Sequence, residues 1–165
     1  MLIAVLSDIH DNIWKLEEVL NELGEAEELI FCGDFCAPFT LKQIADGFPG
    51  PVHVVFGNND GDKLLLSRVA TQAGNVTLHG EFAELELGGR RIAATHYPAI
   101  AAGLAASDRY DLVCFGHSHR VAEERVGDTL LINPGEVMGR FGRSTYVLYD
   151  TDTGEATLRQ VGGWH

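Results

Sequence analysis

Five short apolar segments of this chain each end in a loop that carries Asp, His or Asn. Each segment has the length of a strand, and stretches with apolar residues at helical spacing separate the first three, which predicts parallel βαβ units. The carboxyl ends of parallel strands lie at one edge of an open sheet, so loops that are distant in the sequence are expected to converge there. The five segments cover residues 2–6, 29–32, 52–56, 90–95 and 112–115.

The rest of the chain predicts four helices and several further strands. Helices are expected over 14–23, 41–45 and 63–72, and a fourth around 100–106. Beyond Gly74 the chain changes to short strands and tight turns, with a hairpin that turns at Gly88-Gly89. From Val121 onward, short strands separated by turn residues predict a β-meander.

Length and composition limit the kind of protein. The 165 residues have the size of one domain, so residues 1–165 are predicted to form a single domain. No segment approaches ~18 uninterrupted apolar residues, and the apolar start is too short for a signal peptide, so we expect a cytoplasmic protein without membrane contact. The net charge of −12 argues against a general nucleic-acid-binding surface, because phosphate backbones are bound by clustered Lys and Arg.

Three cysteines, Cys32, Cys36 and Cys114, cannot all pair within one chain, and we interpret them as thiols. The spacing of Cys32 and Cys36 is compatible with zinc, so a zinc or iron site for redox chemistry or storage is one hypothesis. The alternative is that they are small buried residues at strand ends, and the apolar segments beside them favour it.

The polar residues of the five loops are suited to bind metal ions. Imidazole nitrogen and carboxylate oxygen are the ligands expected for manganese, iron, zinc or nickel, and Asp34 has two oxygens with which to bridge a pair of ions. Each residue alone has a simpler explanation: a helix cap for Asp8, a plain turn around Asp34, a structural histidine for His96. Two imidazoles one residue apart, at His117 and His119, have no obvious packing role, so the joint occurrence favours a metal site.

The order of these residues resembles that of a known family, the calcineurin-like metallophosphoesterases. Its motifs are Asp-x-His, Gly-Asp, Gly-Asn-x-Asp/Glu, a lone His and Gly-His-x-His. In size and spacing the chain is most similar to the short prokaryotic phosphodiesterases, which also carry an Asn-Pro-Gly segment. The resemblance implies an α/β (α+β) fold, a four-layer αββα sandwich with two mixed β-sheets flanked by helices. The motifs occur here as Asp8-Ile9-His10, Gly33-Asp34, Gly57-Asn58-Asn59-Asp60, His96 and Gly116-His117-Ser118-His119, followed by Asn133-Pro134-Gly135.

The resemblance also implies a binuclear metal centre. Two divalent ions, with manganese favoured over nickel, iron, zinc or magnesium, lower the pKa of a bridging water, and the resulting hydroxide attacks phosphorus without a covalent enzyme intermediate. Catalytic roles are implied for Asn59, Asp60 and His96, with Asp60 orienting a ligand by a hydrogen bond. The first ion is expected at Asp8, His10, Asp34 and His119, and the second at Asp34, Asn58, His96 and His117.

The implied function is that of a metal-dependent phosphodiesterase or phosphatase, a hydrolase that acts on a small phosphoester. The alternative is a protein-interaction scaffold of the same fold with weak or no catalysis, because a eukaryotic retromer subunit also resembles these short proteins. Intact ligand positions favour the enzyme. A homo-oligomer, dimer or tetramer, is expected by the same resemblance.

Two positions depart from the family's pattern. After His96 the chain has Tyr97-Pro98 where the family usually has Gly, and Tyr97 either stacks against a substrate ring or packs within its loop. Asn59 stands where many members have His. An amide can orient a phosphoryl oxygen but cannot act as a general acid, so we predict a preference for esters with good leaving groups.

We expect Asn59→His to raise the rate of hydrolysis of phosphate esters with poor leaving groups by up to ~10²-fold, the lower end of what a general acid contributes. The measurement compares kcat for aryl and alkyl phosphate esters in the two proteins. The role assigned to this position would be wrong if neither the rate nor the selectivity between leaving groups changed.

Overall fold

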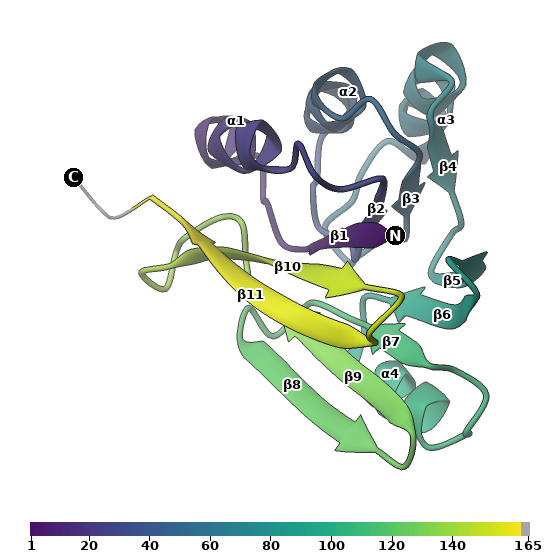
Figure 1. The fold of residues 1–165 in the computed structure, drawn as a ribbon. Coiled ribbons are helices and arrows are strands. Elements are labelled where there is room, and N and C mark those ends of the chain that lie inside the picture. Colours follow the sequence, from purple (N-terminus) through teal and green to yellow (C-terminus); the bar gives the residue numbers. More distant parts are fainter. Residues whose placement is uncertain (163–165) are drawn as a thin grey trace.

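A computed structural model describes residues 1–162 of the chain and arranges them in four layers: helices, sheet, sheet and helix (Figure 1). In the first sheet the spatial order is β11-β10-β1-β2-β3-β4, with β1 to β4 parallel and β10 antiparallel to both β1 and β11. Its strands are β1 (Leu2–Leu6), β2 (Glu28–Phe31), β3 (Val52–Val54), β4 (Val76–Leu78), β10 (Ser144–Asp150) and β11 (Glu155–Val161).

The second sheet is also mixed. Its spatial order is β5-β6-β7-β9-β8, in which β6, β7 and β9 are parallel and the two edge strands are antiparallel to their neighbours. Its strands are β5 (Phe82–Leu87), β6 (Arg90–Thr95), β7 (Leu112–Cys114), β8 (Val121–Val126) and β9 (Thr129–Pro134).

Three helices cover the outer face of the first sheet and one covers the outer face of the second (Figure 1). None of these helices of residues 1–162 combines the length and apolar character that a bilayer span requires. The αββα sandwich with two mixed sheets is therefore confirmed. The helices are α1 (Ile13–Glu22), α2 (Pro38–Gly47) and α3 (Lys63–Ala73) on the first sheet, and α4 (Pro98–Ala105) on the second.

The first sheet is buried on both faces, which explains its continuous apolar strands. In β1, Ala4 and Leu6 pack under the helices, whereas Ile3 and Val5 point to the second sheet. Side chains of a strand alternate between faces, so one five-residue segment contributes to two separate cores. The strand ends are thereby fixed from both sides, and the loops that follow them start from rigid positions.

The β-meander predicted after Val121 is correct for two hairpins, β8–β9 and β10–β11, but wrong between β9 and β10. Strand β9 pairs with β7 and β8 in the second sheet, whereas β10 pairs with β1 and β11 in the first, so the chain changes sheets between Pro134 and Ser144. Every residue of β9 is buried, as suits a central strand with both faces covered. The Asn133-Pro134-Gly135 sequence therefore ends a central strand and does not make a hairpin turn. The structure also adds the short parallel strand β4, which the sequence does not predict.

Gly57 lies where two loops of the first sheet touch. A Cβ atom at this position would overlap Oδ1 of Asp34 and lie 2.7 Å from the Asp34 backbone nitrogen. Only a residue without a side chain allows this approach, so Gly57 sets the distance between the loops that follow β2 and β3.

We expect Gly57→Ala to lower the free energy of unfolding by about 1–3 kcal/mol, because the added methyl group must displace Asp34 or the backbone. Chemical denaturation of the metal-free protein measures the change. Gly61→Ala is the matched control, because nothing lies within 4 Å of a Cβ atom there and its φ is not in the left-handed region. Equal stability of the two variants would contradict the close approach at Gly57.

Candidate metal centre

The carboxyl ends of parallel strands from both sheets meet at one edge of the sandwich. The loops after β1, β2 and β3 come from the first sheet, and the loops after β6 and β7 come from the second. All seven residues predicted to bind metal lie in these loops, and contacts of 3.6 Å or less connect them in one cluster. They are Asp8, His10, Asp34, Asn58, His96, His117 and His119.

One half of the cluster consists of Asp8, His10 and His119. Oδ1 of Asp8 lies 3.3 Å from Nε2 of His119 and 3.6 Å from Nε2 of His10. The two Nε2 atoms are 3.2 Å apart. These three atoms lie within 4.8 Å of one another, close enough to contact one cation together.

The other half of the cluster consists of Asn58, His96 and His117. Oδ1 of Asn58 lies 3.1 Å from Nε2 of His96 and 2.9 Å from Nδ1 of His117, and these two nitrogens are 3.3 Å apart. Asp34 joins the halves, because its Oδ2 is 3.6 Å from Nε2 of His10 and 3.4 Å from Nε2 of His96. A single carboxylate thus faces both groups of ligand atoms.

The donor set fits divalent metal ions. Oδ1 of Asp8 is buried and has no hydrogen-bond partner within residues 1–162, although an unpaired buried carboxylate oxygen is costly. The atoms nearest to it are imidazole nitrogens. A cation among them would satisfy the oxygen and the nitrogens together, and oxygen with imidazole nitrogen suits manganese, iron, nickel or zinc.

The loop backbone is bent sharply at the site. Positive φ angles are uncommon outside glycine and cost roughly 1–2 kcal/mol each, although Asp and His tolerate them better than most residues. Hydrogen bonds from the backbone N–H of Asp8 to the carbonyl of Gly33, and from that of His10 to the carbonyl of Asp34, hold two of these loops together. Such strain is typical of functional sites. The angles are 55° at Asp8, 45° at His10, 61° at Asp34, 68° at His117 and 58° at His119.

Hydrogen bonds on the far side of three imidazole rings fix their orientation. Nδ1 of His96 donates to the carbonyl of Cys32 at 2.7 Å, and Nδ1 of His119 donates to Oε2 of Glu136 at 2.5 Å. Nδ1 of His10 lies 3.7 Å from Sγ of Cys36. Each contact leaves Nε2 directed at the cluster, whereas His117 presents Nδ1 to Asn58.

The electrostatic environment favours an ionised Asp34. Burial would raise its pKa, but the contact with His96 and two hydrogen bonds from Asn59 outweigh burial and hold the pKa well below its ordinary value. The contact with Asp8 raises the pKa of His10. Burial lowers the pKa of His96. The contact with Asp34 and the hydrogen bond to the carbonyl of Cys32 raise it by more, so the net pKa of His96 lies above its ordinary value. A metal ion that binds at these ring nitrogens would compete with protons for them.

Asn59 and Asp60, for which catalytic roles were predicted together with His96, both contact Asp34. Asn59 donates from its side-chain Nδ2 to Asp34 Oδ2 at 2.7 Å and from its backbone to Oδ1 at 2.8 Å. The buried carboxylate of Asp60 accepts from the backbone N–H groups of Asp34, Gly57 and Cys36 at 2.7–2.9 Å. Burial raises the pKa of Asp60. Through these hydrogen bonds Asp60 holds the loop that carries Asp34 against the loop that carries Asn58. Its carboxylate bonds to the backbone of these loops and not to the ligand atoms of the cluster.

The three cysteines do not form a metal site together. All are free thiols; Cys32 and Cys114 lie in the core between the sheets, whereas Cys36 is only partly buried beside His10. Burial raises the pKa of Cys36 to about 12, so this sulfur stays protonated near neutral pH. The interpretation as small buried residues therefore holds for Cys32 and Cys114, but not for Cys36.

The sequence analysis missed Glu136. It is 2% exposed, and its second oxygen accepts from the backbone N–H of Phe141 at 2.7 Å. Glu136 directly follows the Asn133-Pro134-Gly135 segment, and this place in the sequence is the one signal that could have identified it as a site residue. Arg140 was also missed; it lines the cavity of about 360 Å³ above the cluster, together with Met138.

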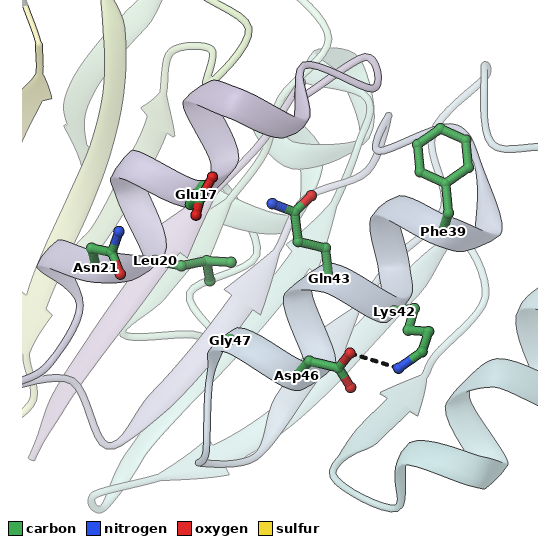
Figure 2. A pocket seen from close by; sticks show the side chains of 8 residues that line it. All are labelled: Glu17, Leu20, Asn21, Phe39, Lys42, Gln43, Asp46 and Gly47. Atoms are coloured by element: carbon green, nitrogen blue, oxygen red, sulfur yellow. Dashed lines mark hydrogen bonds and ion pairs between the residues drawn. The ribbon is translucent and has the colours of Figure 1, made fainter.

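The cavity above the ligand cluster is smaller than another cavity of the molecule. A cavity of about 480 Å³ lies between α1 and α2. Figure 2 shows its lining side chains, among them Leu20 and the exposed Phe39. Among the described residues that line it there is no His or Cys, and Lys42 and Asp46 neutralise each other at 2.6 Å. The chemistry lies in the smaller cavity, where the ligand atoms gather.

Comparisons with known proteins agree with this geometry. The family model described as "Calcineurin-like phosphoesterase superfamily domain" matches residues 1–154. Phosphodiesterase MJ0936 of Methanocaldococcus jannaschii is 32% identical over 161 residues, which cover 94% of this chain and 96% of that protein. The solved structure of an archaeal phosphodiesterase matches with a TM-score of 0.87 at 30% identity, over 98% of this chain and 100% of that one. Vps29 of Chaetomium thermophilum matches at a TM-score of 0.70 and 17% identity, over 98% and 97% of the two chains, a likeness that shows the fold alone.

We expect Glu136→Gln to weaken metal binding by about 10- to 100-fold, because loss of the charge-assisted hydrogen bond leaves the imidazole of His119 less firmly oriented. Isothermal titration of the metal-free protein with Mn²⁺ measures the change. Glu25→Gln, an exposed position on the loop after α1, serves as the control. Equal affinities in the two variants would show that Glu136 does not position His119.

Proposed function

The chain belongs to the calcineurin-like phosphoesterase superfamily, and from this membership we propose that it hydrolyses a phosphodiester at two divalent metal ions. Membership makes the chain a phosphoesterase, that is, a hydrolase. One observation carries the proposal: side chains from five separate loops bring ligand atoms close together, and among them the buried Asp8 Oδ1 has no hydrogen-bond partner within residues 1–162.

We propose manganese as the metal, since the mixture of carboxylate, amide and imidazole donors suits it, with nickel, iron, zinc or magnesium as alternatives. The position of Asp34 between the two halves of the cluster supports a bridging role for its carboxylate. The proposed ligands are Asp8, His10, Asp34 and His119 for the first ion, and Asp34, Asn58, His96 and His117 for the second.

The residues of the cavity bind and orient the ester. When bound, the ions supply an activated water and Lewis-acid stabilisation of the phosphoryl oxygens. Arg140 is the one described cation that lines the cavity, and we propose that it holds a phosphoryl oxygen. No Ser, Thr or Cys is among the described lining residues, which supports attack by water over a covalent intermediate. The amide of Asn59 keeps Asp34 in place but has no proton to give to a leaving group.

A phosphodiester is preferred to a monoester in this proposal. The matched relative and the matched solved structure are both named as phosphodiesterase, at 32% and 30% identity to this chain. The scaffold role has weaker support, because it rests on the likeness to Vps29 at 17% identity and leaves the unpaired Asp8 oxygen without an explanation.

The proposal extends to the setting in which the protein works. We propose that residues 1–165 act as one domain on a small phosphoester, without general nucleic-acid binding, and that the protein assembles as a homo-oligomer. The free thiols support a reducing compartment, and we propose the cytoplasm.

The test is hydrolysis of bis(4-nitrophenyl) phosphate with and without Mn²⁺. We expect activity that a chelator abolishes and that Asp34→Asn lowers by at least ~10²-fold, because the carboxylate faces both ion positions. Asp46→Asn is the matched control, an exposed aspartate on α2 that pairs with Lys42. Activity that survives the chelator would contradict the metal mechanism, whereas stoichiometric metal binding without turnover of any phosphoester would favour the scaffold.

A further inference from the structure

A second cavity of about 210 Å³ adjoins the candidate metal centre. His119 lines both this cavity and the larger one above the ligand cluster, so the two spaces are neighbours on either side of one imidazole. The second cavity has no role in the proposed hydrolysis. Its remaining wall includes Arg120 and Arg143.

Three arginines surround His119 in a protein that is otherwise strongly acidic. Arg120 and Arg143 line the second cavity and Arg140 lines the first, although the chain has 24 acidic and only 12 basic residues. Within residues 1–162, no carboxylate lies within 4.0 Å of these three guanidinium groups. Among the described residues only two of the nine arginines, Arg91 and Arg109, have a carboxylate partner, at 3.6 and 3.0 Å, so it is the shared position of the three at the two cavities that sets them apart.

The carboxylate of the second cavity forms no ion pair with these arginines among the described residues. Glu136 is 2% exposed, and its two oxygens already accept hydrogen bonds from His119 and from the backbone of Phe141. The Thr145 hydroxyl also has a partner, because it donates to the carbonyl of Pro134 at 2.7 Å. The cavity therefore offers a ligand two unpaired positive charges beside a carboxylate that is turned to other partners.

Phe141 lines the second cavity and forms an exposed ridge beside His119, the residue that borders both cavities. Its ring is 69% exposed and meets the ring of His119 edge-on at 5.8 Å, and the guanidinium of Arg140 lies 5.5 Å from its centre. Two hydrogen bonds hold this ridge in place. The backbone N–H of Phe141 donates to Glu136, and Oγ of Ser144 donates to the carbonyl of Val137 at 2.7 Å. The arginines on either side of the ridge are thus carried by an anchored segment.

We propose that the second cavity is a subsite for a second phosphate group, carried by the arm of the substrate that remains after the leaving group departs. This inference rests on the proposed function, which puts the scissile phosphodiester at the metal ions next door. Two guanidinium groups match a dianionic phosphate in charge, and their planar donors bind its oxygens in pairs. The substrate class is a phosphodiester that bears a further terminal phosphate.

Two substrates that differ only in that phosphate test the subsite: thymidine 5′-(4-nitrophenyl phosphate) and the same compound with a 3′-phosphate. We expect kcat/KM of the native protein to be higher for the 3′-phosphorylated substrate by about tenfold or more. In the double variant Arg120→Gln/Arg143→Gln we expect this ratio to fall to about one. Arg68→Gln, which changes an exposed arginine of α3 outside both cavities, is the matched control and keeps the native ratio.

A binding measurement separates the subsite from the proposed function. Calorimetric titration with thymidine 3′,5′-bisphosphate and with thymidine 5′-monophosphate needs no turnover, and we expect tighter binding of the bisphosphate in the native protein only. If neither ester is hydrolysed but this difference in binding persists, the proposed function fails and the subsite stands. If both esters are hydrolysed with equal kcat/KM, or if the double variant keeps the native ratio, the subsite is overturned.

Discussion

Two buried carboxylates held close together determine how this site is built. Asp8 is fully buried and Asp34 is 1% exposed, and oxygens of both lie within 4.8 Å of each other and of a nitrogen of His96. Like charges at such a separation repel each other strongly in a low-dielectric interior, and each also loses its hydration. Within residues 1–162, their ion-pair partners are all histidines. A pair of divalent cations would remove the repulsion, which makes metal binding the simplest reason for this arrangement.

The surrounding loops maintain this unfavourable contact. Gly57 allows the loop after β3 to reach Asp34, and Asp60 binds the backbone of both loops through three N–H groups. Left-handed backbone angles at five of the seven clustered residues turn the chain back as soon as each strand has ended. Rigid strands with apolar residues on both faces absorb this strain, and the ligand atoms are therefore held in position before any ion arrives.

The sequence predicts this site well because its residues follow strands that are easy to recognise. Asp8, Asp34 and His96 each follow a continuous apolar segment, so local pattern and topology together bring them to one edge. The same reasoning fails after Val121, where strands β9 and β10 look alike in sequence but belong to different sheets. Pairing there depends on which face is already covered, and no local pattern contains that information. Glu136 was missed for the same reason, since it lies on the connection that crosses between the sheets.

The ligand atoms come in two sets, one from each sheet. Asp8, Asp34 and Asn58 follow strands of the first sheet, whereas His96 and His117 follow strands of the second. The cluster exists only while the two sheets are docked, so ions that bind it bind the folded chain and not its separated halves. Free metal concentration then enters the folding equilibrium by mass action, and occupancy at a hundred times the dissociation constant adds roughly 2.7 kcal/mol per site to stability. Ions bound at this cluster would in this way hold the two sheets together as well as occupy the site.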